Sequence, residues 1–209
     1  MQYLAHRGYW LKPEQKNSAQ AFSQALQLGF GIETDIRDHQ GQLVIAHDLP
    51  LGHEMLFTEF LSLYQQYPTR PVLALNIKAD GLQLALKQAL TQFSVDNYFA
   101  FDMSVPDGLM CSRAGLTLFT RQSELETKPL SLYQEASGVW IDCFFDDWIT
   151  ESVLQEHLQQ GKKVALVSPE LHKRDHLSTW HYYKNLACIN SDQVYLCTDF
   201  PEAAQRFFA

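Results

Sequence analysis

The sequence predicts an α/β fold, a TIM (β/α)8 barrel formed as a single domain over residues 1–209. Eight short apolar runs alternate with longer amphipathic segments, which is the pattern of parallel strands joined by crossover helices. No linker, repeat or low-complexity tract interrupts this series. The length lies near the lower end for such a barrel, so we expect short loops. An open doubly wound sheet is the alternative, but it usually needs fewer strands.

The elements follow one another in the order that a barrel requires. The predicted strands cover residues 3–6, 31–36, 71–78, 97–101, 116–120, 138–142, 163–168 and 194–198. Helices are predicted over residues 18–29, with Ser18 as N-cap and Gly29 as the stop, and over 57–67, 82–93, 150–161 and 201–208. Residues 104–114 and 122–136 contain Pro, Gly and Ser, and we expect only a turn of helix in each.

One apolar run, "QLVIAHD" at 42–48, does not fit the eight-strand series. Only four residues separate it from the strand before it, which is too short for a crossover helix. It should therefore return antiparallel, as a short hairpin arm after the second strand. With the turn near Gln40, the arm carries His47 back to about the level of Glu33, at the mouth of the barrel.

Composition excludes several classes of function. The formal net charge of −8, without a clustered basic face, argues against nucleic acid as a partner. No apolar stretch reaches the roughly 18 residues that span a membrane. A strand this close to the initiator methionine leaves no room for a signal peptide, so we expect a cytoplasmic protein. The four cysteines are scattered and should be reduced, mostly buried residues. Oligomeric state is left open.

Two carboxylates in "GIETDI" carry the first chemical signal. Ile32 and Ile36 should pack on the helices, which turns Glu33 and Asp35 together into the barrel lumen. Such a pair, about 7 Å apart along one strand and withdrawn from water, needs a positive partner. A hard cation, Mg²⁺ or Ca²⁺, satisfies that need. A buried network with lysine or arginine is the alternative.

Other polar residues end the predicted strands at the same rim, where barrel active sites are built. They are His6, Arg7, Asn76, Lys78, Asp102, Arg121, Asp142, Ser168 and Asp199. About half of such residues can be ordinary strand-ending turn residues. For the histidines at 39, 53, 157, 172, 176 and 181 we expect surface positions, since most fall in polar stretches.

Three linked motifs carry a resemblance to a known family: "AHRG", then "KPEQKNSAQAF", then "LGFGIETDIRDHQGQLVIAHD". In this order and spacing they resemble the N-terminal half of the glycerophosphodiester phosphodiesterases, in the superfamily of phosphatidylinositol phospholipase C-like barrels. The resemblance is dense over residues 3–48 and continues more weakly through "LALNIK" and "CTDFPE".

The resemblance implies a metal-dependent phosphodiester hydrolase that acts on small glycerophosphodiester-like molecules. It implies that His6 and His47 are the catalytic acid and base, without saying which is which. It further implies that Arg7 contacts the substrate phosphate and that Glu33 and Asp35 hold the metal. The residue types suit this chemistry, because histidine titrates near neutral pH and arginine can hold two phosphate oxygens.

The chain departs from the family at three places. Where the family has a glutamate ligand in "EIK", this chain has Asn76, which can still ligate Mg²⁺ or Ca²⁺ but removes a charge that Asp142 could restore. Lys78 matches the family's lysine and would neutralise phosphate or orient Glu33. Lys16 stands where a glutamate is expected, either as a phosphate contact or facing solvent. The capping insertion after the third strand is missing, so the alcohol that is released stays open.

Two other functions remain open on the same scaffold. One is a lyase that stops at a cyclic phosphate, similar to the sphingomyelinase D branch. The other is an inactive relative that binds a phosphorylated metabolite without cutting it, which Asn76 favours. An aldolase or isomerase is less well supported, because no lysine stands isolated for a Schiff base.

Overall fold

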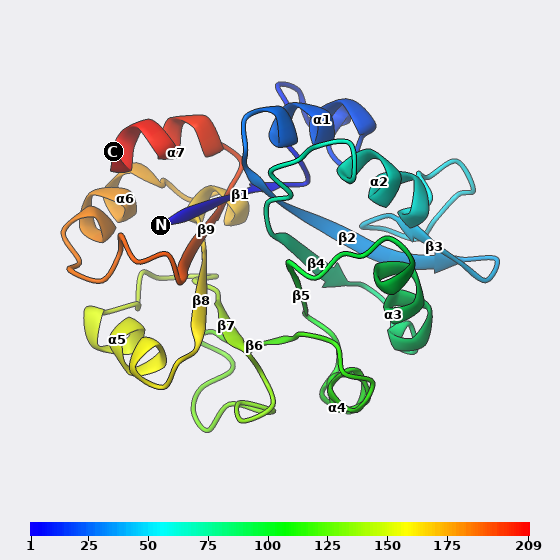
Figure 1. Cartoon of the computed structure of the whole chain (residues 1–209). Helices are drawn as coiled ribbons and strands as arrows, with labels where there is room; N and C mark the ends of the chain where they lie inside the picture. Colours follow the sequence, from blue (N-terminus) through cyan, green and yellow to red (C-terminus); the bar gives the residue numbers. More distant parts are fainter.

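The computed structural model describes residues 1–209, and its strands form one sheet that curls into a barrel with helices outside it (Figure 1). The strands are β1 (Gln2–His6), β2 (Gly31–His39), β3 (Gln42–Ile45), β4 (Leu73–Ile77), β5 (Tyr98–Phe101), β6 (Phe119–Gln122), β7 (Gly138–Ile141), β8 (Lys163–Val167) and β9 (Val194–Thr198). The helices are α1 (Ala19–Gln27), α2 (Phe57–Tyr64), α3 (Gln83–Gln92), α4 (Val105–Arg113), α5 (Glu151–Gln159), α6 (Leu177–Lys184) and α7 (Pro201–Phe208), with 3₁₀ turns η1 (Pro13–Gln15) and η2 (Pro169–His172).

The strand order confirms the predicted TIM barrel. Hydrogen-bonded neighbours run β5-β4-β2-β1-β9-β8-β7-β6, and these eight strands are parallel. Between β5 and β6 the ladder shrinks to one bridge, Ala100 with Leu118. The barrel is therefore closed with a weak seam at this one place.

The predicted hairpin arm is also confirmed. β3 pairs antiparallel with β2, with His39 opposite Gln42 at one end of the ladder and Ile36 opposite Ile45 at the other. It pairs with no other named strand. Gln40 and Gly41 make the turn, both with positive φ (50° and 80°), which is the conformation that two-residue hairpins need.

Three segments differ from the sequence prediction. Residues 105–113 form the full nine-residue helix α4, capped by the Ser104 hydroxyl, which accepts from the Asp107 N–H. Its proline lies in the first turn, where a missing N–H costs nothing. α6 was not predicted, because its apolar residues lack a clear helical period. β6 lies later than predicted, since the polar Arg121 and Gln122 continue its ladder with β7.

Apolar side chains fill the barrel below its rim. Phe99 stacks on Phe119 with ring centroids 3.7 Å apart, and Phe101 stacks on Trp140 at 3.9 Å. Ile32 and Ile36 lie in a separate cluster beneath the helices, as predicted. Because the lumen is packed lower down, the polar residues gather at the carboxyl ends of the strands.

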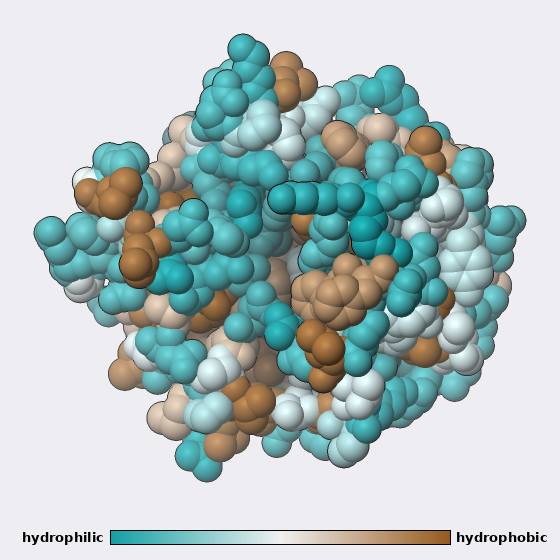
Figure 2. Space-filling model, turned by 180° about the vertical axis from the view of Figure 1, so that it is seen from behind, coloured by the Kyte–Doolittle hydropathy of each residue, from teal (hydrophilic) through white to brown (hydrophobic).

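The surface offers no membrane-spanning element and no single large apolar face on the side seen in Figure 2. No helix combines the length and hydropathy that crossing a bilayer requires. On this face hydrophilic residues predominate around the centre, and hydrophobic side chains form separate small groups (Figure 2). Scattered exposed apolar residues of this kind are normal for a globular surface.

His157 contradicts the expected surface position, because its side chain is completely buried. Its Nε2 lies 2.7 Å from Gln122 Oε1, and its Nδ1 lies 2.8 Å from the Tyr133 hydroxyl. The ring thus ties α5 to β6 and to the loop after β6. Burial, with a smaller contribution from Lys128, lowers the pKa of His157 to about 4.

This histidine predicts a loss of stability in mild acid. Between pH 6.5, the ordinary pKa of histidine, and about 4, the unfolded chain binds a proton that the folded chain excludes. Between pH 7 and pH 4.5 the free energy of unfolding should therefore fall in the native protein. The fall should be about 2 kcal/mol larger than the fall in His157→Gln over the same interval. Urea unfolding of both proteins at the two pH values measures the difference. Equal pH dependence would contradict this role.

Candidate active site

The predicted site residues of β1, β2 and β4 meet at the carboxyl end of the barrel. Glu33 and Asp35 are buried, with 2% and 0% of their surfaces exposed. They alternate along β2 with the outward-packed isoleucines, so both point into the lumen, as predicted. Asn76 is the register partner of Asp35 on β4 and is also buried. The structure therefore places these three side chains on one wall of the lumen.

Asp35 is the centre of a charged network. Its Oδ2 lies 3.0 Å from Arg7 Nε and accepts a hydrogen bond of 2.9 Å from the Asn17 amide. Its Oδ1 lies 3.4 Å from Lys78 Nζ. Asn17 is itself held by the Thr34 hydroxyl, which donates to its Oδ1 over 2.9 Å. The two cations offset the charge of a fully buried carboxylate, which would otherwise be costly.

Backbone geometry explains the sequence His6-Arg7-Gly8. Arg7 and Gly8 have φ values of 58° and 84°, and the Arg7 N–H donates to Glu33 O over 2.9 Å. A Cβ on Gly8 would lie 2.8 Å from backbone and side-chain atoms of Ala21, so only glycine fits there. The tight turn swings the Arg7 side chain from the end of β1 back over β2.

The His6 ring is oriented by Asp199, which follows β9. His6 Nδ1 lies 2.6 Å from Asp199 Oδ1, and Nε2 lies 3.9 Å from Glu33 Oε2. A carboxylate can only accept at Nδ1, so this nitrogen carries the proton and Nε2 faces the lumen. His6 is thus in a position to exchange a proton at Nε2.

His47 stands apart from this group. The Ala46 N–H donates to Asp35 O over 3.1 Å, so the hairpin arm does bring the residue to the rim. The side chain of His47 remains 45% exposed, and its polar contact is with Asp48, 2.8 Å from Nδ1. No hydrogen bond or ion pair joins it to His6, Glu33 or Asp35.

Three buried oxygens at the site have no hydrogen-bond partner: Glu33 Oε2, Asp35 Oδ1 and Asn76 Oδ1. Burial, followed by the charge of Asp35, raises the pKa of Glu33 to about 7, although His6, Arg7 and Lys78 oppose the shift. Lys78 Nζ already forms an ion pair with Asp35 Oδ1, whereas Glu33 Oε2 and Asn76 Oδ1 still need a cation or a donor. All three oxygens belong to residues that the sequence predicts as metal ligands.

The donor set suits a hard divalent cation, although it is sparse. No three His, Cys, Asp or Glu side chains converge in a way that could hold a metal. The third oxygen in this site is the amide oxygen of Asn76, and asparagine is not one of those four residue types. Two carboxylates and an amide fit Mg²⁺ or Ca²⁺, since both accept oxygen ligands and Mg²⁺ in particular keeps several waters. Asp142 is engaged elsewhere, by the Trp140 indole and His172.

A second set of charges continues from Lys78 around the rim. Lys78 Nζ lies 3.9 Å from Asp102 Oδ2, and Asp102 Oδ1 accepts from Arg121 Nη1 over 2.6 Å. Arg121 Nε also donates to Glu126. Lys16, for which two roles were open, lies 3.6 Å from Asp199 Oδ2 and 4.4 Å from the centre of the Trp10 ring.

The sequence predicts Asp199 at the rim but not its role as the partner of His6. Nor does it single out Asn17, and it predicts a surface position for His172. His172 is half-buried, and its Nε2 lies 2.8 Å from Asp142 Oδ1. No local pattern could reveal these pairs, because their members lie 30 and 193 residues apart.

Several solved structures share this barrel fold along nearly the whole chain. A protein from Galdieria sulphuraria, provisionally assigned as a glycerophosphodiester phosphodiesterase, superposes with a TM-score of 0.78 at 16% identity, covering 99% of this chain and 97% of that one. An Oleispira antarctica phosphodiesterase, solved with the product sn-glycerol-3-phosphate, superposes with a TM-score of 0.72 at 18% identity. The match covers 99% of this chain and 96% of that one. A Ca²⁺-dependent phosphatidylinositol-specific phospholipase C from Streptomyces antibioticus superposes with a TM-score of 0.60 at 11% identity. The match covers 100% of this chain and 96% of that one.

The fold is therefore the same kind of barrel as in these structures. The chain is similar along nearly its whole length to the Galdieria sulphuraria and Oleispira antarctica proteins, which confirms the expected resemblance at the level of the fold. No protein-family model matches the sequence, and no curated protein sequence matches it.

Proposed function

We propose that this protein is a metal-dependent phosphodiesterase that hydrolyses small glycerophosphodiester-like substrates at the carboxyl end of the barrel. The observation that carries the proposal is the meeting of His6, Arg7 and Lys78 with three buried oxygens that accept no hydrogen bond on the same rim. A phosphodiester needs positive charge around its oxygens and a group that exchanges protons beside them. The similarity in fold to phosphodiesterases supports the same reaction class.

Arg7 and Lys78 would bind the phosphate. Both already point at Asp35, and both remain partly exposed, with 21% and 19% of their side-chain surfaces open. A guanidinium can hold two phosphate oxygens at once, whereas an ammonium acts as a point charge. Their charges would oppose the negative charge that grows on the oxygens during attack.

His6 would act on the proton of the attacking or leaving oxygen through Nε2, with Asp199 holding the ring and stabilising its protonated form. His47 would serve the opposite face of the phosphate. It reaches the rim on the hairpin arm, and its exposure leaves the ring free to turn toward a bound substrate. Catalytic hydrogen bonds of this kind often form only in the substrate complex.

Glu33, Asp35 and Asn76 would hold Mg²⁺ or Ca²⁺ through the three buried oxygens that accept no hydrogen bond, and the cation would take the place of Lys78 at Asp35 Oδ1. A divalent cation there would neutralise the buried carboxylates and supply Lewis-acid stabilisation of phosphoryl charge. The amide of Asn76 contributes no charge, so we expect weaker binding than at a site with three carboxylates.

An assay of glycerophosphodiesters and an aryl phosphodiester, with Mg²⁺ or Ca²⁺ and with a chelator, tests the proposal. We expect turnover with metal and a loss of at least a hundredfold with chelator, because the cation would supply several kcal/mol of charge stabilisation. Phosphorus NMR of the product separates hydrolysis from a lyase reaction that stops at a cyclic phosphate. Tight binding of a phosphodiester without turnover over hours would instead identify an inactive binding protein.

A further inference from the structure

Glu170, in the 3₁₀ turn η2 after β8, contacts the end of β9. Its Oε1 accepts two hydrogen bonds, one from the Thr198 hydroxyl and one of 3.1 Å from the Asp199 N–H. Thr198 is completely buried, and its hydroxyl oxygen in turn accepts from the Phe200 N–H over 3.0 Å. One carboxylate oxygen thus holds both the backbone and a side chain at the point where β9 ends.

The other carboxylate oxygen ties Glu170 to the buried interior. Its Oε2 accepts from the Ser168 hydroxyl, and Ser168 Oγ accepts from the Trp180 indole N–H over 2.8 Å. Ser168 and Trp180 are 0% and 1% exposed. Each hydroxyl in this row both donates and accepts a hydrogen bond, from α6 through η2 to β9. A satisfied buried network of this kind makes the local structure rigid.

The row of hydrogen bonds leads to His6. In the parallel ladder between β1 and β9, Ala5 is the register partner of Thr198, so Asp199 leaves β9 at the level of His6. Asp199 Oδ1 lies 2.6 Å from His6 Nδ1, and its Oδ2 lies 3.6 Å from Lys16 Nζ. The backbone of Asp199, which Glu170 holds, therefore sets the position of the carboxylate that orients the His6 ring.

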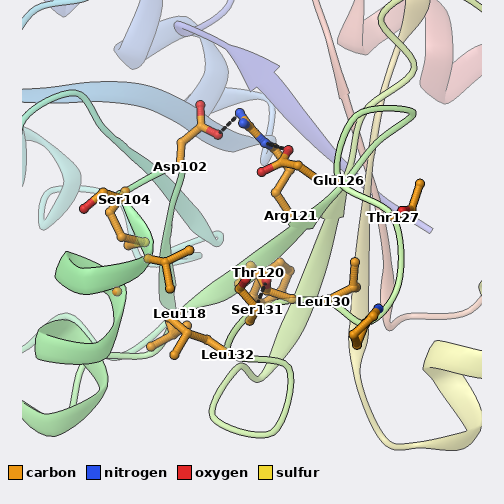
Figure 3. A pocket seen from close by; sticks show the side chains of 15 residues that line it. Asp102, Ser104, Leu118, Thr120, Arg121, Glu126, Thr127, Leu130, Ser131 and Leu132 are labelled. Carbon is orange, nitrogen blue, oxygen red and sulfur yellow. Dashed lines mark hydrogen bonds and ion pairs between the residues drawn. The ribbon is translucent and has the colours of Figure 1, made fainter.

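Other carboxylates at the rim hold other parts of it. Glu126 and Asp102 both accept from Arg121, beside a side cavity of about 180 Å³ at the seam between β5 and β6 (Figure 3). Glu124 accepts the N–H groups of residues 144–146 and so fixes the loop after β7. No hydrogen bond or ion pair joins these three carboxylates to the wall formed by β1 and β9. Glu170 is thus the carboxylate whose loss would release the end of β9.

We propose that Glu170 is a positioning residue for the pair His6–Asp199. The inference rests on the proposed phosphodiesterase function, and it adds a residue that acts on the reaction without contacting the substrate. Loss of the carboxylate leaves the Asp199 N–H and the Thr198 hydroxyl without their acceptor, so the end of β9 can shift. A misplacement of about 1 Å in a catalytic group can cost up to a hundredfold in rate. Binding of the phosphate should not change, since no phosphate-binding group contacts Glu170.

Kinetics on a glycerophosphodiester with Mg²⁺ or Ca²⁺ test the role in the reaction. Glu170→Ala should lower kcat by about tenfold or more and leave KM within about twofold of the native value. Glu170→Gln should keep kcat within about threefold, because its amide oxygen accepts from the same two donors and its NH₂ group donates to Ser168 Oγ. In the Asp199→Asn background, Glu170→Ala should cost less than about a further threefold, since it acts through Asp199.

Glu124→Ala is the matched control. It also removes three hydrogen bonds to a rim carboxylate, but these fix the loop after β7 and not the end of β9. It should leave kcat within about twofold of the native value, and its effect should be the same with and without Asp199→Asn.

Nitrogen-15 NMR of the histidine rings tests the positioning itself and does not depend on turnover. At about pH 8.5, well above the ordinary pKa of histidine, imidazole is neutral and its two tautomers give distinct ring-nitrogen resonances. In the native protein His6 should carry its proton at Nδ1 alone, and comparison with His6→Gln assigns its signals. Glu170→Ala should introduce the Nε2–H tautomer, whereas Glu170→Gln and Glu124→Ala should not.

A second variant, Thr198→Val, covers the case in which Glu170→Ala fails to fold. It removes one of the two donors to Glu170 Oε1 and should produce the same tautomer change to a smaller extent. A native tautomer in both variants, or an equal fold loss of kcat for Glu170→Ala with and without Asp199→Asn, would overturn the positioning role. Absence of turnover in the native protein with either metal would overturn the phosphodiesterase proposal alone, because the NMR spectra still decide whether Glu170 holds the pair.

Discussion

Replacing His6 by glutamine should lower kcat on a glycerophosphodiester by about a thousandfold while the fold stays intact, because general acid–base catalysis is worth 10²- to 10⁴-fold. Glutamine keeps the size of the side chain and some of its polarity, but it cannot exchange a proton. His6 is the histidine best placed for this role, since Asp199 fixes the ring and Nε2 faces Glu33. Initial rates at saturating substrate, together with thermal unfolding, measure both quantities.

Two further variants delimit the effect. His181→Gln, at an exposed position of α6 away from the rim, should retain full activity. Asp199→Asn should cost about a hundredfold in kcat with little change in KM, because its amide can donate to Nδ1 and so favour the wrong tautomer of His6. Wild-type turnover in His6→Gln would remove this histidine from the mechanism.

Glu33→Gln and Asn76→Glu should change metal affinity in opposite directions. Glu33→Gln removes one of the two lumen carboxylates and should abolish measurable binding of Mg²⁺ or Ca²⁺, with activity falling as far as it does with chelator. Asn76→Glu adds a third carboxylate beside Asp35, its register partner, and should tighten binding about tenfold or more, since ligand charge sets affinity in oxygen sites. Isothermal titration calorimetry with each metal gives both values.

Glu135→Gln is the matched control for these charges, since its side chain is exposed in the loop after β6. It should bind metal as the native protein does. If Asn76→Glu binds Mg²⁺ and Ca²⁺ no more tightly than the native protein does, then position 76 is not part of a metal site. Asp35 would then be satisfied by Arg7 and Lys78 alone.

The barrel and the wall of carboxylates could be predicted because their signals are local. Alternation along 31–36 separates the helix-facing isoleucines from Glu33 and Asp35, and the four-residue gap before 42 permits only a hairpin. Each of these features depends on neighbouring residues, so one sequence was enough to predict it.

The rest depends on contacts between distant segments. The His6–Asp199 pair joins the two ends of the chain, and the Arg121–Asp102 pair crosses the seam between β5 and β6. His157 is buried because the loop after β6 folds over α5, which no periodicity in its own helix shows. Nor could the sequence show that β5 and β6 share a single bridge, on which the side cavity depends.

A crystal structure of the protein soaked with Mn²⁺, an anomalous scatterer that replaces Mg²⁺ in oxygen sites, tests the central claim most directly. We predict one strong anomalous peak coordinated by carboxylate oxygens of Glu33 and Asp35, with Lys78 moved away from Asp35 or shared with a bound phosphate. A structure with no peak at these carboxylates, and with Lys78 and Arg7 still paired to Asp35, would contradict a metal-dependent site.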